Sequence, residues 1–234
     1  MNPSFNKKKA IVLGGTHGLG RAIAEMLLKN GAEVVIAGKD KMLVDEVTKE
    51  LTPFGKVIGH VLDLLLDYDV DLFIEELDGY FNGEIDFLIN AAGFFKVKAF
   101  NETSVSDYDA LLDLNRGFFF ITQEVAKKMG TTGGGAILNI SSFLSRQAVR
   151  GIQAAAFSMA KAGLEAFTRQ LSIELAPSKI RVNAISIGIL ENGTFYGGKW
   201  SEIVNIVSFL LSGQASYVNG AVWEVDAGLF AGRL

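Results

Sequence analysis

The chain has 234 residues, no cysteine, two histidines and a formal net charge of −4 at neutral pH. This composition excludes a disulfide framework, a thiolate metal site and a cysteine nucleophile, and it gives no basic footprint for nucleic acid. The hydrophobic fraction of 49% can fill the core of one large domain, and no apolar run approaches the roughly 20 residues of a membrane span. We therefore expect one domain over residues 1–234, in the cytoplasm, with no metal and with no membrane or nucleic-acid partner.

Short apolar strands alternate with longer helical patterns along the whole chain. The strands are rich in β-branched residues and alternate little, which is typical of parallel strands covered on both faces. This order predicts an α/β fold, a Rossmann-like doubly wound parallel sheet in three α/β/α layers. The expected strands span residues 10–13, 33–37, 56–61, 85–89, 136–140, 180–185 and 221–225, and the expected helices span residues 21–28, 41–51, 70–77, 104–129, 153–175 and 201–211.

A glycine-rich turn joins the first strand to the first helix. Gly14, Gly18 and Gly20 let the backbone turn sharply and approach an anion closely. The first amides of the helix then point at that anion with the positive end of the helix dipole behind them. A strand, a glycine turn and a helix in this order favour a nucleotide-phosphate site over a turn that serves packing alone.

Further short motifs follow the glycine turn in a fixed order. They are Asn-Ala-Ala-Gly at 90–93, Leu-Asn-Arg-Gly-Phe at 114–118, Ile-Ser-Ser at 140–142, Ala-Lys-Ala-Gly at 160–163, Arg-Val-Asn-Ala-Ile at 181–185 and Val-Asp-Ala-Gly at 225–228. The ordered set resembles the short-chain dehydrogenase/reductase family from about residue 9 to residue 228. The resemblance implies an oxidoreductase that uses NAD(H) or NADP(H) to reduce a ketone or oxidise a secondary alcohol, with a small-molecule carbonyl or alcohol as substrate.

The resemblance also implies where the dinucleotide binds. Asp63 and Leu64 are expected to flank the adenine, and Lys161 is expected to bridge the hydroxyls of the nicotinamide ribose. Gly188 stands where the family has the glycine of a Pro-Gly pair after the sixth strand. The pyrophosphate and its ribose are expected at Gly14, Thr16, His17, Gly18, Leu19 and Gly20, and the nicotinamide side at Asn90, Ala91 and Gly93.

The end of the second strand bears on the choice of dinucleotide. A carboxylate there would bind a ribose 2′-hydroxyl and repel a 2′-phosphate, but this chain has Gly38 at that position, followed by Lys39. Lys39 and His17 together would face a 2′-phosphate, so NADP(H) is favoured over NAD(H). In the alternative, Lys39 is an ordinary solvated lysine, and Asp40 binds the ribose of NAD(H).

The family's catalytic tyrosine is replaced. Its position is held by Phe157, four residues before Lys161, and phenylalanine has no proton to give or take. Loss of a general acid–base group costs roughly 10²–10⁴-fold in rate. By resemblance, Ser142 polarises the carbonyl, and Asn115 holds a water that links the lysine to solvent. Ser145 is the alternative serine, because the interval from Ser142 to position 157 is a little longer than in the family.

Several explanations of the phenylalanine stay open. The substitution is engineered, or the chain is a natural dinucleotide-binding regulatory subunit without turnover, or another group such as Ser158 or Tyr196 supplies the proton. A lyase or isomerase on the same scaffold is a further reading. The short segment from residue 189 to 200 and the Ile187-Gly188 pair favour a natural lineage with an unusual substrate site.

The helices expected at 104–129 and 153–175 pair between subunits in the family. Three consecutive aromatics, Phe118, Phe119 and Phe120, lie in the first of them and cannot all face one core. We therefore expect a homodimer or homotetramer.

Overall fold

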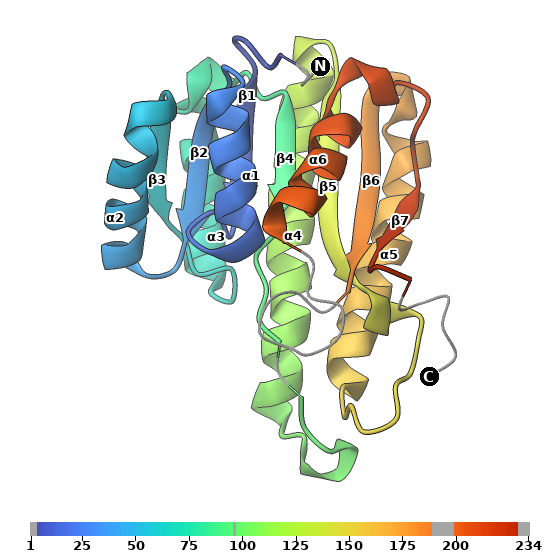
Figure 1. The fold of residues 1–234 in the computed structure, drawn as a ribbon. Coiled ribbons are helices and arrows are strands. Elements are labelled where there is room, and N and C mark those ends of the chain that lie inside the picture. Colours follow the sequence, from blue (N-terminus) through green and yellow to red (C-terminus); the bar gives the residue numbers. More distant parts are fainter. Residues whose placement is uncertain (1–3, 96, 189–198, 229–234) are drawn as a thin grey trace.

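One parallel sheet carries the fold of the chain (Figure 1). The computed structural model describes residues 4–95, 97–188 and 199–228. In this part of the chain, seven strands pair in the order β3-β2-β1-β4-β5-β6-β7, all parallel. The strands are β1 (Lys9–Leu13), β2 (Glu33–Gly38), β3 (Val57–Val61), β4 (Phe87–Asn90), β5 (Gly135–Ser142), β6 (Ile180–Ile187) and β7 (Val222–Val225). The doubly wound α/β fold predicted from the sequence is confirmed.

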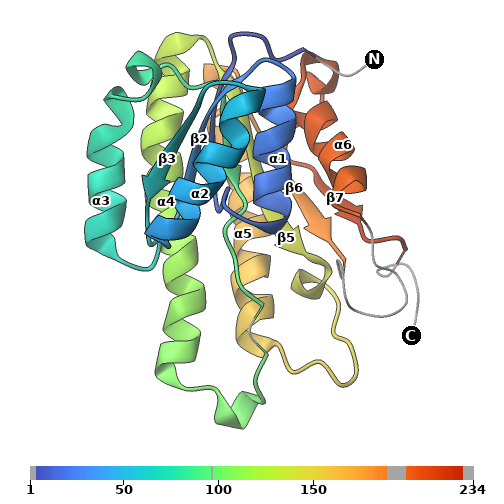
Figure 2. The same ribbon diagram turned by 60° about the vertical axis from the view of Figure 1, so that its left-hand side comes forward.

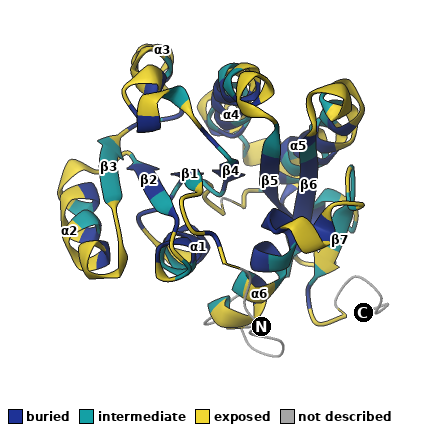
Figure 3. Cartoon of the chain, turned by 90° about the horizontal axis from the view of Figure 1, so that it is seen from above, coloured by how far each residue is buried: buried dark blue, intermediate teal, exposed yellow. Residues whose placement is uncertain are grey.

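Helices cover both faces of the sheet, as the views in Figures 2 and 3 show. One face carries α1 (Gly18–Lys29), α2 (Lys41–Leu51) and α6 (Trp200–Leu211), and the other carries α3 (Asp67–Glu75), α4 (Val105–Thr132) and α5 (Ala155–Glu174). Each face has its own apolar cluster. Ile23 of α1 and Val207 of α6 belong to the first cluster, and Phe73 of α3 and Phe118 of α4 belong to the second.

Strand β1 shows why the strands are apolar throughout. Successive side chains of a strand point to opposite faces of the sheet. Ala10 and Val12 pack in one apolar cluster, whereas Ile11 and Leu13 pack in the other, and all four are fully buried. Because helices cover both faces, neither set of alternate positions can be polar.

The order of the strands fixes where a ligand can bind. The chain runs outward from β1 to β2 and β3 on one side, and from β4 to β7 on the other. Loops that follow β1 and β4 therefore diverge and leave a crevice at the carboxyl ends of these strands. This end is the lower one in Figure 1, where α4 and α5 extend beyond the sheet.

Most predicted element boundaries differ from the observed ones by one to three residues, and two of the differences are informative. The helix predicted at 70–77 was misplaced: α3 begins at Asp67, and a short 3₁₀ turn follows it over Glu76–Asp78. Asp67 and Asp69 favour the earlier start because acidic side chains stabilise the first turn of a helix. Strand β5 was predicted too short, because it continues to pair with β6 as far as Ser142 opposite Ile187.

Among the described helices, none combines the length and the apolarity that crossing a membrane would require.

Candidate active site

The carboxyl ends of β1, β4, β5 and β6 border a cavity of about 420 Å³. This volume lies in the range that is typical of small-molecule sites. Its described lining residues are Gly14, His17, Gly18, Leu19 and Gly20 after β1, Ala91, Ala92, Gly93, Phe94 and Phe95 after β4, Ile140, Ser141, Ser142, Phe143 and Leu144 at the end of β5, Ile152, Phe157 and Lys161 at α5, Ile187 and Gly188 at the end of β6, and Trp200 of α6.

The structure brings most of the predicted site residues together at this cavity. Those that line it are Gly14, His17, Gly18, Leu19, Gly20, Ala91, Gly93, Ser142, Phe157, Lys161 and Gly188. Those that do not line it are Thr16, Lys39, Asp63, Leu64, Asn90 and Asn115.

The glycine turn after β1 is held by close backbone contacts. Gly14 has a φ of +80°, and a Cβ added to it would lie 2.4 Å from the Cα of Ala92. A Cβ on Gly20 would lie 2.1 Å from the carbonyl oxygen of Gly14. A side chain at either position would push the turn away from β4 or from the first turn of α1. The glycines therefore set how closely the start of α1 approaches the cavity.

The amino end of α1 is available to an anion. Its N-cap residue, His17, makes no side-chain hydrogen bond to the first turn, and the first turn holds no acidic residue. The first amides of a helix have no partner within the helix, and they carry the positive end of its dipole. Since His17, Gly18, Leu19 and Gly20 line the cavity, a phosphate placed there would meet these amides. A dinucleotide pyrophosphate fits this donor set.

The end of β2 has little room for a side chain. A Cβ on Gly38 would lie 2.7 Å from Cγ2 of Thr16, whose buried side chain covers this point. The hydroxyl of Thr16 lies 3.2 Å from Nδ1 of His17. Thr16 therefore packs beneath the turn instead of lining the cavity. Next to it, Lys39 is exposed, with no salt bridge to another described residue.

Two carboxylates near this edge of the sheet accept hydrogen bonds from nearby backbone amides. Asp40 caps α2, where its Oδ1 accepts a hydrogen bond from the amide of Leu43 at 3.0 Å. After β3, Oδ1 of Asp63 accepts a hydrogen bond from the amide of Leu65 at 3.0 Å. Leu64 is buried beside Gly117 of α4. Asp63 and Leu64 thus lie at the carboxyl end of β3, outside the cavity.

Asn90 was predicted to line the nicotinamide side, and the structure corrects this. Its side chain is fully buried, and Nδ2 donates hydrogen bonds to Oδ1 of Asn139 at 2.7 Å and to Oγ1 of Thr122 at 3.2 Å. Asn139 lies directly opposite on β5 and donates in turn to Thr168 of α5. Asn90 therefore joins β4, β5 and the two long helices beneath the cavity. Its neighbours Ala91 and Gly93 do line the cavity.

Lys161 lies beside the turn that follows β4. Its Nζ donates a hydrogen bond to the carbonyl oxygen of Ile140 at 2.9 Å, and a Cβ on Gly93 would lie 3.8 Å from it. Burial disfavours the charged ammonium and lowers the pKa of Lys161 to about 8. This lysine can therefore hold or release a proton close to neutral pH, within reach of a ligand in the cavity.

Phe157 both packs in the core and lines the cavity. The ring is 6% exposed and belongs to an apolar cluster with Leu111, Phe143 and Ala160. Nζ of Lys161 lies 5.8 Å from the centroid of the ring, within the range of a cation–π contact. Among the described aromatic rings, Phe95 packs edge-on against Phe157 at 5.3 Å.

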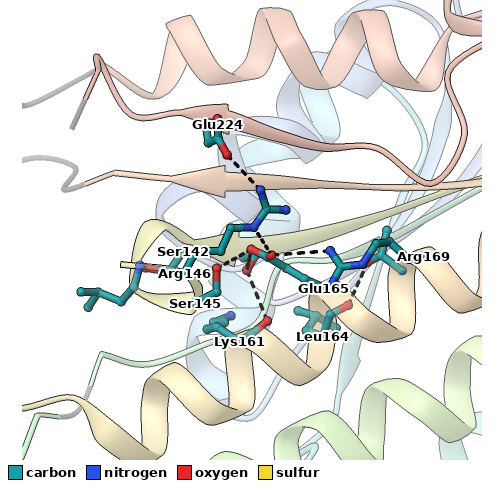
Figure 4. Close-up of polar contacts among 11 residues, drawn as sticks. Ser142, Ser145, Arg146, Lys161, Leu164, Glu165, Arg169 and Glu224 are labelled. Carbon is teal, nitrogen blue, oxygen red and sulfur yellow. Dashed lines mark hydrogen bonds and ion pairs between the residues drawn. The ribbon is translucent and has the colours of Figure 1, made fainter. Parts of the chain in front are cut away.

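The two candidate serines have different surroundings (Figure 4). Ser142 lines the cavity, and its hydroxyl accepts a weak hydrogen bond from the amide of Leu144 at 3.4 Å. Ser145 lies on the 3₁₀ turn that follows and does not line the cavity. Its hydroxyl donates to the carboxylate of Glu165. The geometry therefore favours Ser142 for a contact with a bound carbonyl group.

Glu165 is a buried carboxylate that the sequence analysis missed. It lies on α5 one turn after Lys161, and its oxygens accept hydrogen bonds from Ser141 Oγ at 2.9 Å and Arg146 Nε at 2.7 Å. Arg146 also donates to Glu224 of β7 at 2.9 Å. The one available signal was a charge four residues after Lys161, on the same face of an amphipathic helix.

Asn115 joins the two long helices near the cavity. Its Nδ2 donates a hydrogen bond to the carbonyl oxygen of Ala160 at 2.7 Å, next to Lys161. The contact places Asn115 against the backbone that precedes Lys161. The water molecule that is expected to connect Lys161 to solvent stays a prediction.

Of the other candidates for a proton donor, Ser158 is not among the described residues that line the cavity. Tyr196 and residues 189–198 of the predicted short segment lie outside the described residues. The described Asp, Glu and His side chains form no cluster of three that could hold a metal ion. Trp200 and Phe95, which the sequence analysis did not single out, do line the cavity.

Known proteins resemble this chain over nearly its whole length. The family model described as short chain dehydrogenase matches residues 8–204. A 3-oxoacyl-(acyl-carrier-protein) reductase of Aquifex aeolicus is 34% identical over 253 residues, which cover 98% of this chain and all of the relative. A 3alpha-hydroxysteroid dehydrogenase of Mediterraneibacter gnavus is 32% identical, covering 95% of this chain and 96% of the relative.

A solved structure from Beutenbergia cavernae has the same fold. It is described as an NAD(P)-dependent gluconate 5-dehydrogenase with bound NADP, and it superposes with a TM-score of 0.90 at 28% identity. The match covers 98% of this chain and 99% of that chain. The family-model match and the two relatives extend over the strands, the glycine turn and α5 with its lysine, so this chain belongs to the short-chain dehydrogenase/reductase family of oxidoreductases.

Proposed function

We propose that this chain binds NADP(H) in the cavity at the carboxyl end of the sheet and is built to reduce a ketone or oxidise a secondary alcohol. The observation that carries the proposal is that the uncapped amino end of α1 and Lys161 line one cavity. Related proteins named as reductases and dehydrogenases support the reaction class. When bound, the dinucleotide would supply or accept the hydride.

Each residue has a defined part in this proposal. The amides at His17 to Gly20 bind the pyrophosphate, and Lys161 binds the hydroxyls of the nicotinamide ribose. Ser142 donates a hydrogen bond to the carbonyl oxygen of the substrate, while Asn115 supports the backbone beside Lys161. Phe157 stands where a hydroxyl would exchange a proton with that oxygen, and its ring has none. Turnover of the chain as it stands is therefore impaired.

Lys39 favours NADP(H) over NAD(H). It is exposed and forms no salt bridge with any other residue that the structure describes, whereas one oxygen of Asp40 already caps α2. A ribose 2′-phosphate would find a free cation here and no carboxylate at position 38.

We also propose that the chain is a cytoplasmic homo-oligomer paired through α4 and α5. Phe118 is fully buried, but Phe119 and Phe120 are each 45% exposed on the outer face of α4. Phe119, Phe167 and Leu171 help to line a groove of about 460 Å³ between the two helices. An aromatic face of this kind is typical of a surface that another subunit covers.

Dinucleotide binding can be tested through Trp200, which lines the cavity. We expect NADPH to bind and to quench tryptophan fluorescence in a saturable way. Gly20→Val should abolish the quenching, because a Cβ at this position already meets the carbonyl of Gly14. Gly213→Val is the matched control, since a Cβ there meets no atom within 4 Å. Failure of both NADPH and NADH to bind the wild type would overturn the proposal.

A further inference from the structure

The cavity has two chemically different parts. Around the amino end of α1 and Lys161 it offers backbone amides and a cation. The remaining wall is apolar and is built by Phe94, Phe95, Phe143, Leu144, Ile152 and Phe157. These side chains come from the connection after β4, from the segment after β5 and from α5, so three distant stretches of sequence supply one apolar surface.

Polar groups on this apolar wall are few and already partly occupied. Ser142 contributes one hydroxyl. Ser141 also reaches the wall, but its hydroxyl donates to the buried carboxylate of Glu165 at 2.9 Å. Among the described residues, the wall thus offers one hydroxyl that can still donate a hydrogen bond, which can orient one oxygen atom of a ligand but cannot solvate several hydroxyl groups.

Within the part of the chain that the structure describes, the apolar wall offers no cation to an acidic ligand. Lys161 is the only lysine or arginine among the described lining residues, and it lies on the dinucleotide side. Among the described cations on the flanking segments, Lys98 is paired with Asp107, and Arg146 with Glu165 and Glu224, while Arg150 is exposed and does not line the cavity. A carboxylate or phosphate on a substrate would therefore lose its hydration without a partner, which disfavours binding.

Aromatic rings continue this wall from the floor of the cavity to its mouth. Phe157 and Phe143 are nearly fully buried, whereas Phe95 is 62% exposed. The rings of Phe95 and Phe157 meet edge to face at 89°. A ring of a ligand placed against Phe95 would cover apolar surface that water now contacts, and this burial favours binding.

We infer that the substrate is a neutral, apolar carbonyl compound that carries a ring. Its oxygen lies at Ser142 and its ring lies against Phe157 and Phe95. The inference rests on the proposed function, because it assigns the dinucleotide to the other part of the cavity. It names the substrate class and excludes acidic and polyhydroxylated carbonyl compounds.

A pair of ketones that differ in one charge tests this inference. Acetophenone and 4-acetylbenzoate have the same ketone and the same ring, but only the second carries a carboxylate. Titration calorimetry with the protein saturated with NADP⁺ measures binding without turnover. We expect acetophenone to bind about 10-fold more tightly than 4-acetylbenzoate, because the carboxylate finds no cation on the apolar wall.

A matched pair of variants locates the binding surface. Phe95→Ala should weaken the binding of acetophenone about 5-fold, because it removes the ring at the mouth. Phe100→Ala removes an equally large ring that is 85% exposed and does not line the cavity, and it should leave the affinity unchanged. Absence of acetophenone binding, equal or tighter binding of 4-acetylbenzoate, or an unchanged affinity in Phe95→Ala would overturn the inference.

The titration separates this inference from the proposed function. NADP⁺ binding is measured first, in the absence of ketone. If NADP⁺ does not bind, the proposed function fails, and the two ketones are titrated into the protein without dinucleotide. The preference for acetophenone and its loss in Phe95→Ala are expected there too, since the apolar wall contains no part of the dinucleotide site.

Discussion

Phe157 and Lys161 show how much one oxygen atom matters in this cavity. Burial lowers the pKa of Lys161 to about 8, so most of the lysine population still carries its charge at neutral pH. A positive charge next to a phenol would lower the pKa of that phenol toward neutrality. The ring of Phe157 lies 5.8 Å from this charge and has no group to titrate. In the proposed function, the lysine therefore keeps its place while the acid that it would tune is missing.

In the proposed function, a single residue, Lys39, also bears on the choice of cofactor. Lys39→Asp should weaken the binding of NADPH relative to NADH about 10-fold or more, because it replaces an attractive charge with a repulsive one beside the 2′-phosphate. Competitive fluorescence titrations with both dinucleotides measure this ratio. Lys49→Asp is the control, because it makes the same charge change on an exposed residue in the last turn of α2. An unchanged ratio in Lys39→Asp would remove Lys39 from the choice of cofactor.

Single side chains were harder to predict than motifs. The positions of Ser142 and Lys161 at one cavity followed from motifs that end parallel strands or recur along one helical face. Asn90 ends a strand as well, but its buried side chain does not line the cavity and instead donates a hydrogen bond to Asn139 on the neighbouring strand. Sequence order alone does not say on which side of a strand end a side chain lies. Phe95 was missed because a loop residue shows no periodicity.

At the scale of elements, Glu165 joins parts of the fold that are far apart in sequence. It connects α5 to the end of β5 through Ser141, and to the following turn through Ser145 and Arg146. Arg146 extends the connection to β7 through Glu224 (Figure 4). This network fixes the segment that presents Ser142 to the cavity. Its members lie on α5, β5, the turn after β5 and β7, so the hydrophobic pattern of any one element gives no sign of it.

Removal of the Glu165 carboxylate should therefore destabilise the fold. Glu165→Ala leaves the guanidinium of Arg146 and the hydroxyl of buried Ser141 without this partner, and we expect a loss of about 3 kcal/mol in the free energy of unfolding. Urea unfolding measures the loss. Glu174→Ala on the exposed end of the same helix should change stability by about 0.5 kcal/mol or less. Equal stability of the two variants would show that the network contributes little.

The chain as a whole exposes an aromatic face away from its cavity. The predicted α/β/α layers and the parallel sheet followed from the alternation of strands and helices, because short right-handed connections allow few other topologies. The exposed pair of rings at Phe119 and Phe120 also followed from the sequence, since three successive helical residues point in different directions. What covers these rings depends on a second molecule, which no pattern within one chain specifies.

Sedimentation velocity can test whether a second subunit covers this face. We expect the wild type to sediment as a dimer or tetramer, and Phe120→Glu to dissociate it, because a buried unpaired carboxylate is costly at an apolar interface. Met42→Glu adds the same charge at an exposed position on α2, across the sheet, and should not change the assembly. A monomeric wild type, or a Phe120→Glu variant that assembles as the wild type does, would contradict pairing through α4 and α5.

The most direct test of the whole account is the rate of NADPH oxidation by wild type and Phe157→Tyr with a panel of neutral aromatic ketones. We predict that Phe157→Tyr is faster than the wild type by about 10²–10⁴-fold, because the new hydroxyl lies beside Lys161 and can give its proton to the carbonyl oxygen. Phe157→Leu, which adds no proton, should stay as slow as the wild type. A Phe157→Tyr variant that binds NADPH and yet is no faster than the wild type with any ketone would contradict the account.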